Sequence, residues 1–355
     1  MRRILILSAF LVLAACATPK TQTPTIQDAA LRAEQERQQD LIFERDLSHK
    51  MRLLTVSHRL KTANLDLCKD EQGAEFGFSY VLAEEINRDH HPAWKRHLPI
   101  GEVPVIDIVV AGGPADQAGL QRGDLIRSFN NMKPRPEKGP REWRRMLDRR
   151  LDDIKPLALQ IDRKGSLETI DITPVAGCAS TVLFVDEPDI NATADGDTVR
   201  VTRGMMEFVE SDDEIAFVVG HELAHNHMDH IGAKRTNSIA GGIGGLAIDV
   251  LFAAAGVNTN GAFMRSGMNA GAASYSVDFE KEADYVGLYY AERAGFDTSQ
   301  VGDFWRRLAI NDPKRTTHRN SHPTTPERFL AIDETRKEIS AKLETGTALL
   351  PNMKK

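Results

Sequence analysis

Cysteine, aromatic residues and excess positive charge are all scarce in this chain of 355 residues. Lysine and arginine number 45 against 51 acidic residues, and the net charge of −6 argues against a nucleic-acid-binding protein, because such proteins usually present a basic face. Three cysteines cannot all pair with one another, so at least one has another role. A content of 41% hydrophobic and 27% charged residues excludes a disordered chain, and the length predicts more than one domain.

The first 15 residues have the pattern of a secretory signal peptide. Two arginines precede an apolar run from Ile4 to Ala15, which is shorter than the roughly 20 residues needed to cross a bilayer. The run ends in Leu-Ala-Ala before Cys16 and resembles the bacterial lipobox, which implies that Cys16 is lipidated and becomes the new N-terminus. An ordinary signal peptide with a chance cysteine is the alternative. We predict a signal peptide at 1–15 and a lipidated cysteine with a polar tether at 16–40.

This N-terminus predicts a protein of the bacterial periplasm that a lipid anchor holds to a membrane. The outer membrane is favoured, because Ala17 rather than aspartate follows the cysteine. Residues 41–70 are expected to form a helix that docks on the body, because apolar residues recur there at helical spacing. These residues are Phe43, Leu47, Met51, Leu54 and Leu65.

Residues 71–178 alternate short apolar runs with turns, which predicts a small β-domain. The stretch GGPADQAGLQRGDLI at 112–126 resembles bacterial PDZ domains, and the resemblance implies a peptide groove near Phe76, Gly77 and Phe78. Glu75 stands where that family has the first glycine of its carboxylate-binding loop. In such a groove, backbone N–H groups bind a carboxylate while the peptide adds a strand to the sheet. A structural β-domain that binds no separate ligand is the alternative.

Cys68 and Cys178 flank this β-domain. The periplasm permits disulfides, so we predict a bond between these two residues that closes a loop of about 110 residues. Two buried free thiols are the alternative.

Residues 179–350 contain the candidate metal-binding and catalytic residues. Ser211 and Glu214 form a capping-box pattern that predicts a helix start, and the helix carries His221-Glu222-Leu-Ala-His225. Two histidines four residues apart share a helix face and can bind one zinc ion, while Glu222 can act as a general base toward water. A helix whose histidines merely pack is the alternative.

A third ligand is expected from a second helix. A metzincin would have histidine at position 231, which is isoleucine here, so that class is excluded. Glu280 and Asp284 are four residues apart, so Glu280 is expected to complete a His₂Glu site while Asp284 hydrogen-bonds a ligating imidazole. Glu282 is a weaker candidate. His227 and His230 are expected to face solvent or to support the ligands.

These motifs together resemble the HtpX and CAAX prenyl protease family of zinc metalloendopeptidases, and most closely its soluble periplasmic lipoproteins. The motifs are HELAH at 221–225, EKEAD at 280–284, Ser321-His322-Pro323 with Arg328, and Asn191-Ala192. The resemblance implies one zinc ion per chain held by His221, His225 and Glu280, with Glu222 as general base. It places His322 and Arg328 near the cleft, where His322 stabilises an oxyanion or occupies the open zinc position in a latent state. A packing role for His322 is the alternative.

The predicted fold is α+β, with a small PDZ-like β-domain before a mainly helical gluzincin metallopeptidase domain that has a short edge-strand sheet. An extended peptide is expected along the edge strand near Asn191, Val199, Val201 and Thr202. Residues 238–274 are expected to form a mobile lid over the cleft. Membrane insertion of that segment is disfavoured, because glycines and Asp249 interrupt its apolar stretch.

The sequence therefore predicts a zinc-dependent metalloendopeptidase that hydrolyses unfolded or misassembled envelope proteins, with the PDZ-like domain binding substrate or regulating access. Its expected partners are polypeptides and a membrane, with no nucleic acid. A catalytically silent envelope scaffold or chaperone that only binds peptides is the first alternative. An aminopeptidase with the same zinc ligands is the second.

Overall fold

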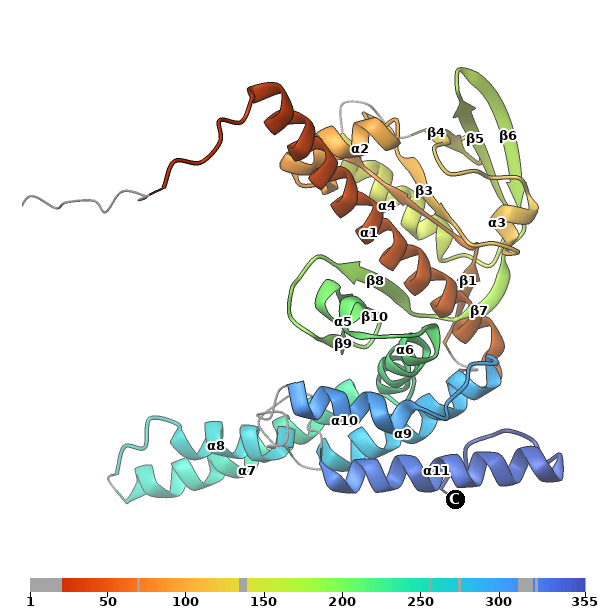
Figure 1. The fold of residues 1–355 in the computed structure, drawn as a ribbon. Helices are drawn as coiled ribbons and strands as arrows, with labels where there is room; N and C mark the ends of the chain where they lie inside the picture. The colour runs from red at the N-terminus through yellow and green to blue at the C-terminus, as the bar shows by residue number, and fades with distance from the viewer. Residues whose placement is uncertain are drawn as a thin grey trace, which may run out of the picture.

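The computed structural model describes residues 21–68, 71–133, 139–255, 257–273, 276–311, 322 and 325–354. The expected signal peptide and Cys16 lie outside these residues. A β-rich N-terminal region precedes a mostly helical C-terminal region, so the α+β prediction is confirmed (Figure 1).

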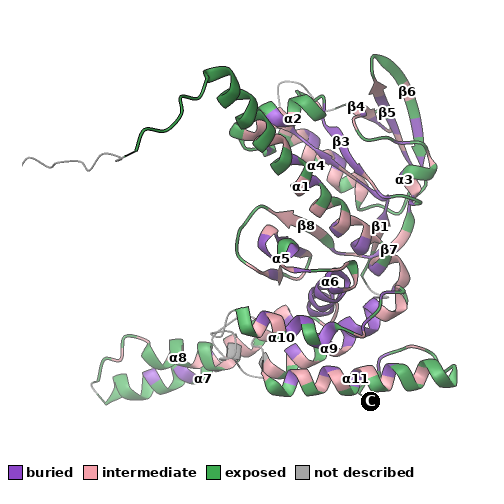
Figure 2. Cartoon of the chain, in the orientation of Figure 1, coloured by how far each residue is buried: buried purple, intermediate pink, exposed green. Residues whose placement is uncertain are grey.

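The long helix α1 (Asp28–Ala63) runs along both regions (Figure 1). It begins 13 residues before the expected helix start at residue 41, so the prediction of a tether up to residue 40 is wrong. Alanine, leucine, glutamate, glutamine and arginine dominate residues 28–40, and all are strong helix formers. Phe43 and Leu47 pack into a core with the β-domain, whereas Leu53, Val56 and Leu60 pack into the core of the helical region. The helix thus joins the two regions through its buried face (Figure 2).

The β-domain is built on a five-stranded antiparallel sheet in the order β2-β3-β4-β5-β6. Its core contains Phe129, Trp143 and Leu147, which join the sheet to helix α4. The strands are β2 (Phe78–Val81), β3 (Val105–Val109), β4 (Leu125–Phe129), β5 (Leu157–Arg163) and β6 (Ser166–Ile172). The helices are η1 (Ala83–Glu85), η2 (Arg88–His90), α2 (His91–His97), α3 (Pro114–Gln117) and α4 (Pro140–Leu151).

A two-stranded ladder of β1 (Gln72–Glu75) and β7 (Val175–Cys178) connects the β-domain to the end of α1. Cys178 forms a disulfide with Cys68, and their Cα atoms are 5.6 Å apart. Glu75 is buried and forms ion pairs with Lys61 and His58 of α1. Gly177 permits this approach, because a Cβ atom there would lie 2.7 Å from Cγ of Glu75. The departure from the glycine of the PDZ loop at position 75 therefore serves the contact with α1.

The second sheet has the order β8-β10-β9, with β8 (Thr181–Val185) parallel and β9 (Ala192–Ala194) antiparallel to β10 (Thr198–Thr202). The prediction that Val199, Val201 and Thr202 belong to an edge strand is wrong, because β10 has a neighbour on both sides and all three side chains are buried. Thr202 instead caps α5 (Arg203–Phe208), accepting a hydrogen bond from the Met205 amide. Among the described strands, β9 is the edge next to the cleft.

Helices form the rest of the C-terminal region around α6 (Asp212–His227) and α9 (Ser276–Arg293). Ser211 caps α6, accepting a hydrogen bond of 3.2 Å from the Glu214 amide. Gly220 and Gly287 let the two helices touch, because a Cβ atom on Gly287 would lie 2.8 Å from the backbone nitrogen of His221. This contact brings the HExxH helix beside Glu280. The remaining helices here are α10 (Val301–Asn311) and α11 (Pro326–Thr345).

Helices α7 (His230–Ala254) and α8 (Ala262–Ala273) form a hairpin that projects away from the body (Figure 1). The prediction of a lid at 238–274 is wrong, because the hairpin projects from the body and none of its described residues lines the pocket. Membrane insertion of this segment, which the sequence disfavours, is not tested by the structure. By length and composition α7 qualifies as a candidate span, and only 17% of its apolar window is buried. The helix continues through its glycines and Asp249: Gly241, Gly242 and Gly245 face α8, and Asp249 accepts hydrogen bonds within the hairpin.

Candidate metal centre

Four side chains from three parts of the chain converge below α6. Ligand atoms of His221, His225, Glu280 and His322 all lie within 4.8 Å of one another. Nε2 of His221 and Nε2 of His225 are 3.2 Å apart, and each lies 3.4 Å from a carboxylate oxygen of Glu280. The three residues predicted as zinc ligands are therefore neighbours.

The donor set fits a metal ion such as zinc. His221, His225 and Glu280 are at most 2% exposed, and two imidazoles with one carboxylate are typical zinc ligands. Among the described residues, Oε1 of Glu280 accepts no hydrogen bond, although buried carboxylate oxygens normally have a partner. A cation bound between these three side chains would satisfy that oxygen.

Asp284 orients His221. Oδ1 of Asp284 lies 2.9 Å from Nδ1 of His221, in an ion-pair contact that lacks hydrogen-bond geometry, and Nε2 of His221 lies toward Glu280. Burial alone would lower the pKa of His221, but Asp284 and Glu280 raise it to about 9. A more basic imidazole is also a stronger metal ligand.

His225 is oriented by a second chain of contacts that runs through His230 to Glu282. Nδ1 of His230 lies 2.9 Å from Nδ1 of His225, and Nε2 of His230 lies 3.0 Å from Oε2 of Glu282. Because the carboxylate accepts the proton of His230 Nε2, the Nδ1 atom of His230 accepts the proton of His225 Nδ1. Nε2 of His225 is then left with its lone pair toward the centre. Burial lowers the pKa of His225 to about 3, which keeps the imidazole neutral.

Arg328 reaches the centre from α11. Its guanidinium forms two hydrogen bonds of 2.7 Å to the two oxygens of Asp284 and lies 3.3 Å from Oε2 of Glu280. It also stacks over the Trp305 ring at 4.4 Å from the centroid. Burial would raise the pKa of Asp284, but Arg328 and His221 hold it below its usual range. Arg328 is itself 2% exposed, so it positions carboxylates rather than facing the pocket.

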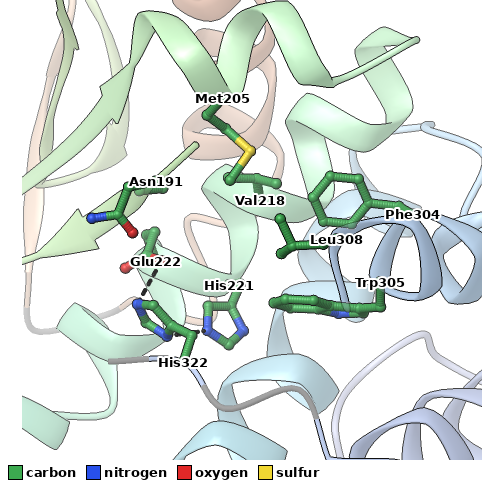
Figure 3. A pocket seen from close by; sticks show the side chains of 10 residues that line it. Asn191, Met205, Val218, His221, Glu222, Phe304, Trp305, Leu308 and His322 are labelled. Carbon is green, nitrogen blue, oxygen red and sulfur yellow. Dashed lines mark hydrogen bonds and ion pairs between the residues drawn. The ribbon is translucent and has the colours of Figure 1, made fainter. Parts of the chain in front are cut away.

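Glu222 and His322 lie at the open side of the centre (Figure 3). Nε2 of His322 is 3.4 Å from Oε1 of Glu222, and Nδ1 of His322 is 2.8 Å from Oε2 of Glu280. Oε2 of Glu222 has no hydrogen-bond partner among the described residues, although Glu222 is buried. Burial would raise the pKa of Glu280, but His322, His221 and His225 hold it well below its usual range. Glu280 is therefore a carboxylate anion.

A pocket opens beside these residues. Its polar side is formed by Asn191, His221, Glu222 and His322, and its other side is apolar (Figure 3). The apolar residues are Ala192, Met205, Val218, Phe304, Trp305 and Leu308. The sequence analysis missed the α10 part of this wall, although the spacing of Phe304, Trp305 and Leu308 marks one face of a helix.

The remaining predicted site residues are placed as follows. Glu282 contacts His230 and is not among the clustered donors. His230 is buried and contacts His225. His227 lies away from the centre, with its Nδ1 atom 3.0 Å from the Tyr290 hydroxyl. Burial lowers the pKa of His227 to about 4. Of the residues predicted to line the substrate strand, Asn191 alone borders the pocket.

Phe76, Gly77 and Phe78 lie in the β-domain at the start of β2. The two phenylalanines are buried in its core, and the Gly77 carbonyl accepts a hydrogen bond from the Val110 amide. Gly77 has φ of 72°, a conformation that favours glycine. Beyond this loop, the Tyr80 hydroxyl donates to Asp148 of α4 and thereby ties β2 to that helix. A peptide-binding role for this loop stays a prediction.

Comparison with known proteins matches two segments of the chain. Residues 174–336 match the sequence profile of peptidase family M48, and residues 105–160 match that of the PDZ domain. The chain is 27% identical over 204 residues to the mitochondrial metalloendopeptidase OMA1 of Schizosaccharomyces pombe, covering 56% of this chain and 59% of that protein.

Two bacterial relatives are also similar. A beta-barrel assembly-enhancing protease of Vibrio cholerae is 32% identical over 137 residues, which is 36% of this chain and 28% of that protein. Metalloprotease YcaL of Escherichia coli is 35% identical over 148 residues, which is 39% of this chain and 56% of that protein. The chain thus spans less than two thirds of the length of these three relatives. The chain therefore carries a segment similar to peptidase family M48 at 174–336 and a segment similar to the PDZ domain at 105–160.

Proposed function

We propose that this protein is a zinc metalloendopeptidase that cleaves extended segments of unfolded or misassembled envelope proteins. The observation that carries the proposal is the buried His221, His225 and Glu280 donor set with the Glu222 carboxylate beside it, facing a pocket. A scaffold that only binds peptides has no need of a carboxylate at that position.

His221, His225 and Glu280 would hold the zinc ion, and Asp284 and His230 would fix the two imidazoles. When bound, zinc supplies a Lewis acid that polarises the peptide carbonyl and lowers the pKa of water. Glu222 accepts the proton of the attacking water and returns it to the leaving amine. The open Oε2 atom of Glu222 is the oxygen that is available for this transfer.

The substrate would lie extended along β9, the edge strand that enters the pocket. The far edge of β9 pairs with no other strand among the described residues, and Asn191 and Ala192 stand beside Glu222 in the pocket wall. Backbone pairing with that edge does not depend on side-chain sequence, which suits segments of unfolded chains. Among the described residues that line the pocket, Glu222 is the one acidic side chain, and this favours an endopeptidase over an aminopeptidase, which would need a further carboxylate for the free amino terminus.

His322 would keep the resting enzyme latent. Its Nδ1 atom lies 3.3 Å from Nε2 of His221 and among the clustered donors, where it would take the coordination position that water needs. A peptide entering along β9 would have to displace it. In the displaced state the same imidazole is available to stabilise the oxyanion.

The cellular setting is also part of this proposal. One relative is named as a beta-barrel assembly-enhancing protease, and this name supports an envelope location. Lipidation of Cys16 would hold the protein to a membrane, with the outer membrane favoured. The PDZ domain would bind substrate segments or regulate access to the pocket.

The first experiment is the metal content of the purified chain, measured beside Glu280→Ala and Glu222→Gln. About one zinc ion is expected in the wild type and in Glu222→Gln, with loss in Glu280→Ala. Cleavage of a reduced, unfolded protein is then expected to fall about 10²–10⁴-fold in Glu222→Gln, and product mapping is expected to show internal cuts. A folded wild type without zinc would favour the peptide-binding scaffold. Full cleavage by Glu222→Gln would show that Glu222 is not the general base. Stepwise removal of terminal residues would indicate an aminopeptidase.

A further inference from the structure

The hairpin of α7 and α8 is held together by glycines rather than by large apolar side chains. A Cβ atom on Gly241 would lie 2.1 Å from the Gly267 carbonyl oxygen, and one on Gly245 would lie 2.0 Å from the Phe263 carbonyl oxygen. A Cβ atom on Gly271 would lie 2.0 Å from the Asn237 carbonyl oxygen. The two backbones are therefore in direct contact. Small residues at such close crossings are typical of helix pairs in lipid.

The large apolar side chains of the hairpin are consequently exposed, and much of the hairpin has the colour of exposed residues in Figure 2. On α7, Ile239, Ile243, Leu246 and Val250 recur every three or four residues and form a continuous stripe with exposed fractions of 47–66%. We call these four residues the outer stripe. Leu251 beside it is 70% exposed. A water-soluble hairpin would bury such residues between its helices, so this arrangement is reversed with respect to an aqueous environment.

Charge on the hairpin has the distribution expected at a membrane surface. Between residues 236 and 277, Asp249 and Arg265 are the only charged residues. Asp249 is buried at the hairpin end, where it accepts hydrogen bonds from the Phe263 and Met264 amides and from the Thr259 hydroxyl. The hairpin therefore presents no carboxylate to its surroundings, in a chain with a net charge of −6. Exposed Arg235 at the base and Arg265 near the tip are complementary to anionic headgroups.

We propose that the α7–α8 hairpin docks on a phospholipid bilayer, with the outer stripe in the acyl region and the arginines at the phosphates. The 12 residues of α8 span roughly 18 Å, less than the roughly 30 Å of a bilayer core, so the hairpin lies in one leaflet rather than crossing the membrane. Helix α7 starts at His230, which contacts the metal centre, so docking holds the pocket close to the membrane surface. The N-terminal end of α1 leaves the body on the same side as the hairpin in Figure 1, so an N-terminal anchor and the hairpin can engage one membrane together.

The test uses depth in the bilayer, because an N-terminal anchor alone would also keep the protein on vesicles. A fluorophore sensitive to polarity is attached to Ile243→Cys and Val250→Cys in the full chain, with Ile310→Cys and Leu330→Cys as controls. Ile310 and Leu330 are 79% and 67% exposed on other helices. A chain without an added cysteine corrects for labelling at Cys16. Each protein is bound to phosphatidylethanolamine–phosphatidylglycerol vesicles that carry nitroxide on the lipid chains.

We expect a blue shift and at least about twofold quenching by the nitroxide lipids at positions 243 and 250, and neither at 310 or 330. Adding Val250→Glu to the Ile243→Cys chain is expected to abolish the quenching, whereas adding Ile310→Glu is not. Equal quenching at all four positions, or none at 243 and 250, would overturn the proposal. A blue shift that depends on protein concentration and occurs without vesicles would also overturn it, because a second copy would then cover the stripe. Metal content serves as the check that each variant is folded.

Discussion

Arg328 and Asp284 form a bidentate ion pair in the interior of the helical region, with Nε and Nη2 of the guanidinium each 2.7 Å from a different carboxylate oxygen. Asp284 in turn lies 2.9 Å from Nδ1 of His221. The orientation of an expected metal ligand on α6 therefore depends on an arginine of α11, more than 100 residues later in the chain.

Replacing Arg328 with lysine is expected to weaken metal binding about 10–100-fold, because lysine keeps the charge but cannot form two parallel hydrogen bonds with Asp284. A competition titration with a chelator measures this change. Arg306→Lys is the matched control, since Arg306 is half exposed and pairs with Asp303 at the surface. Unchanged affinity in a folded Arg328→Lys chain would show that the ion pair does not orient His221.

His230→Ala is expected to lower metal affinity about 10–100-fold by removing the acceptor that sets the tautomer of His225. The control is His227→Ala, which removes a half-buried histidine from the same end of α6 without touching a ligand. We expect the control to lose stability of about 1 kcal/mol from its contact with Tyr290 and to keep its metal affinity. If both variants lose affinity equally, the effect comes from general loosening of the helix.

The disulfide is expected to contribute about 4–5 kcal/mol to the free energy of unfolding, because its bond closes a loop spanning 110 residues of separation in the unfolded chain. Urea unfolding of the Cys68→Ala, Cys178→Ala double variant, beside the wild type with and without reductant, measures it. The double variant and the reduced wild type should agree. An unchanged unfolding midpoint in both would mean that the β1–β7 ladder and α1 hold this junction unaided.

The contact between Glu75 and α1 is expected to make stability depend on pH. Burial would raise the pKa of Glu75, but Lys61 and His58 outweigh burial and hold it below its usual range. The pair therefore stabilises the fold fully above the unfolded pKa of about 4.3, and its contribution is lost as pH falls through the lower folded pKa.

Glu75→Gln is accordingly expected to be less stable than the wild type by roughly 3 kcal/mol at pH 7, with the difference shrinking below about pH 4. Chemical unfolding at several pH values gives the comparison. Exposed Glu84→Gln is the control and should match the wild type throughout. A constant difference across the acid range would assign the loss at position 75 to packing rather than to charge.

The residues of the candidate site follow from short-range spacing in the sequence. A separation of four residues places His221 with His225, and Glu280 with Asp284, on single helix faces whatever surrounds those helices. The PDZ-like stretch and the helical character of α1 are likewise local patterns, and for that reason they can be recognised from the sequence alone. Helix α1 begins at Asp28, inside the predicted tether at 16–40, because the residues there favour a helix despite their polar composition.

Sequence alone therefore determined which residues are equipped to bind a metal and to move a proton, because those properties belong to residue types and to helical periodicity. Tertiary structure alone decided which strand is an edge, since β10 becomes central only through pairing with β8. It also decided that His230 supports His225, that α10 forms part of the apolar wall, and that Gly241, Gly242 and Gly245 of α7 face α8. Each of these features depends on contacts between segments that are distant in the chain, and local residue spacing does not determine which distant segments come into contact.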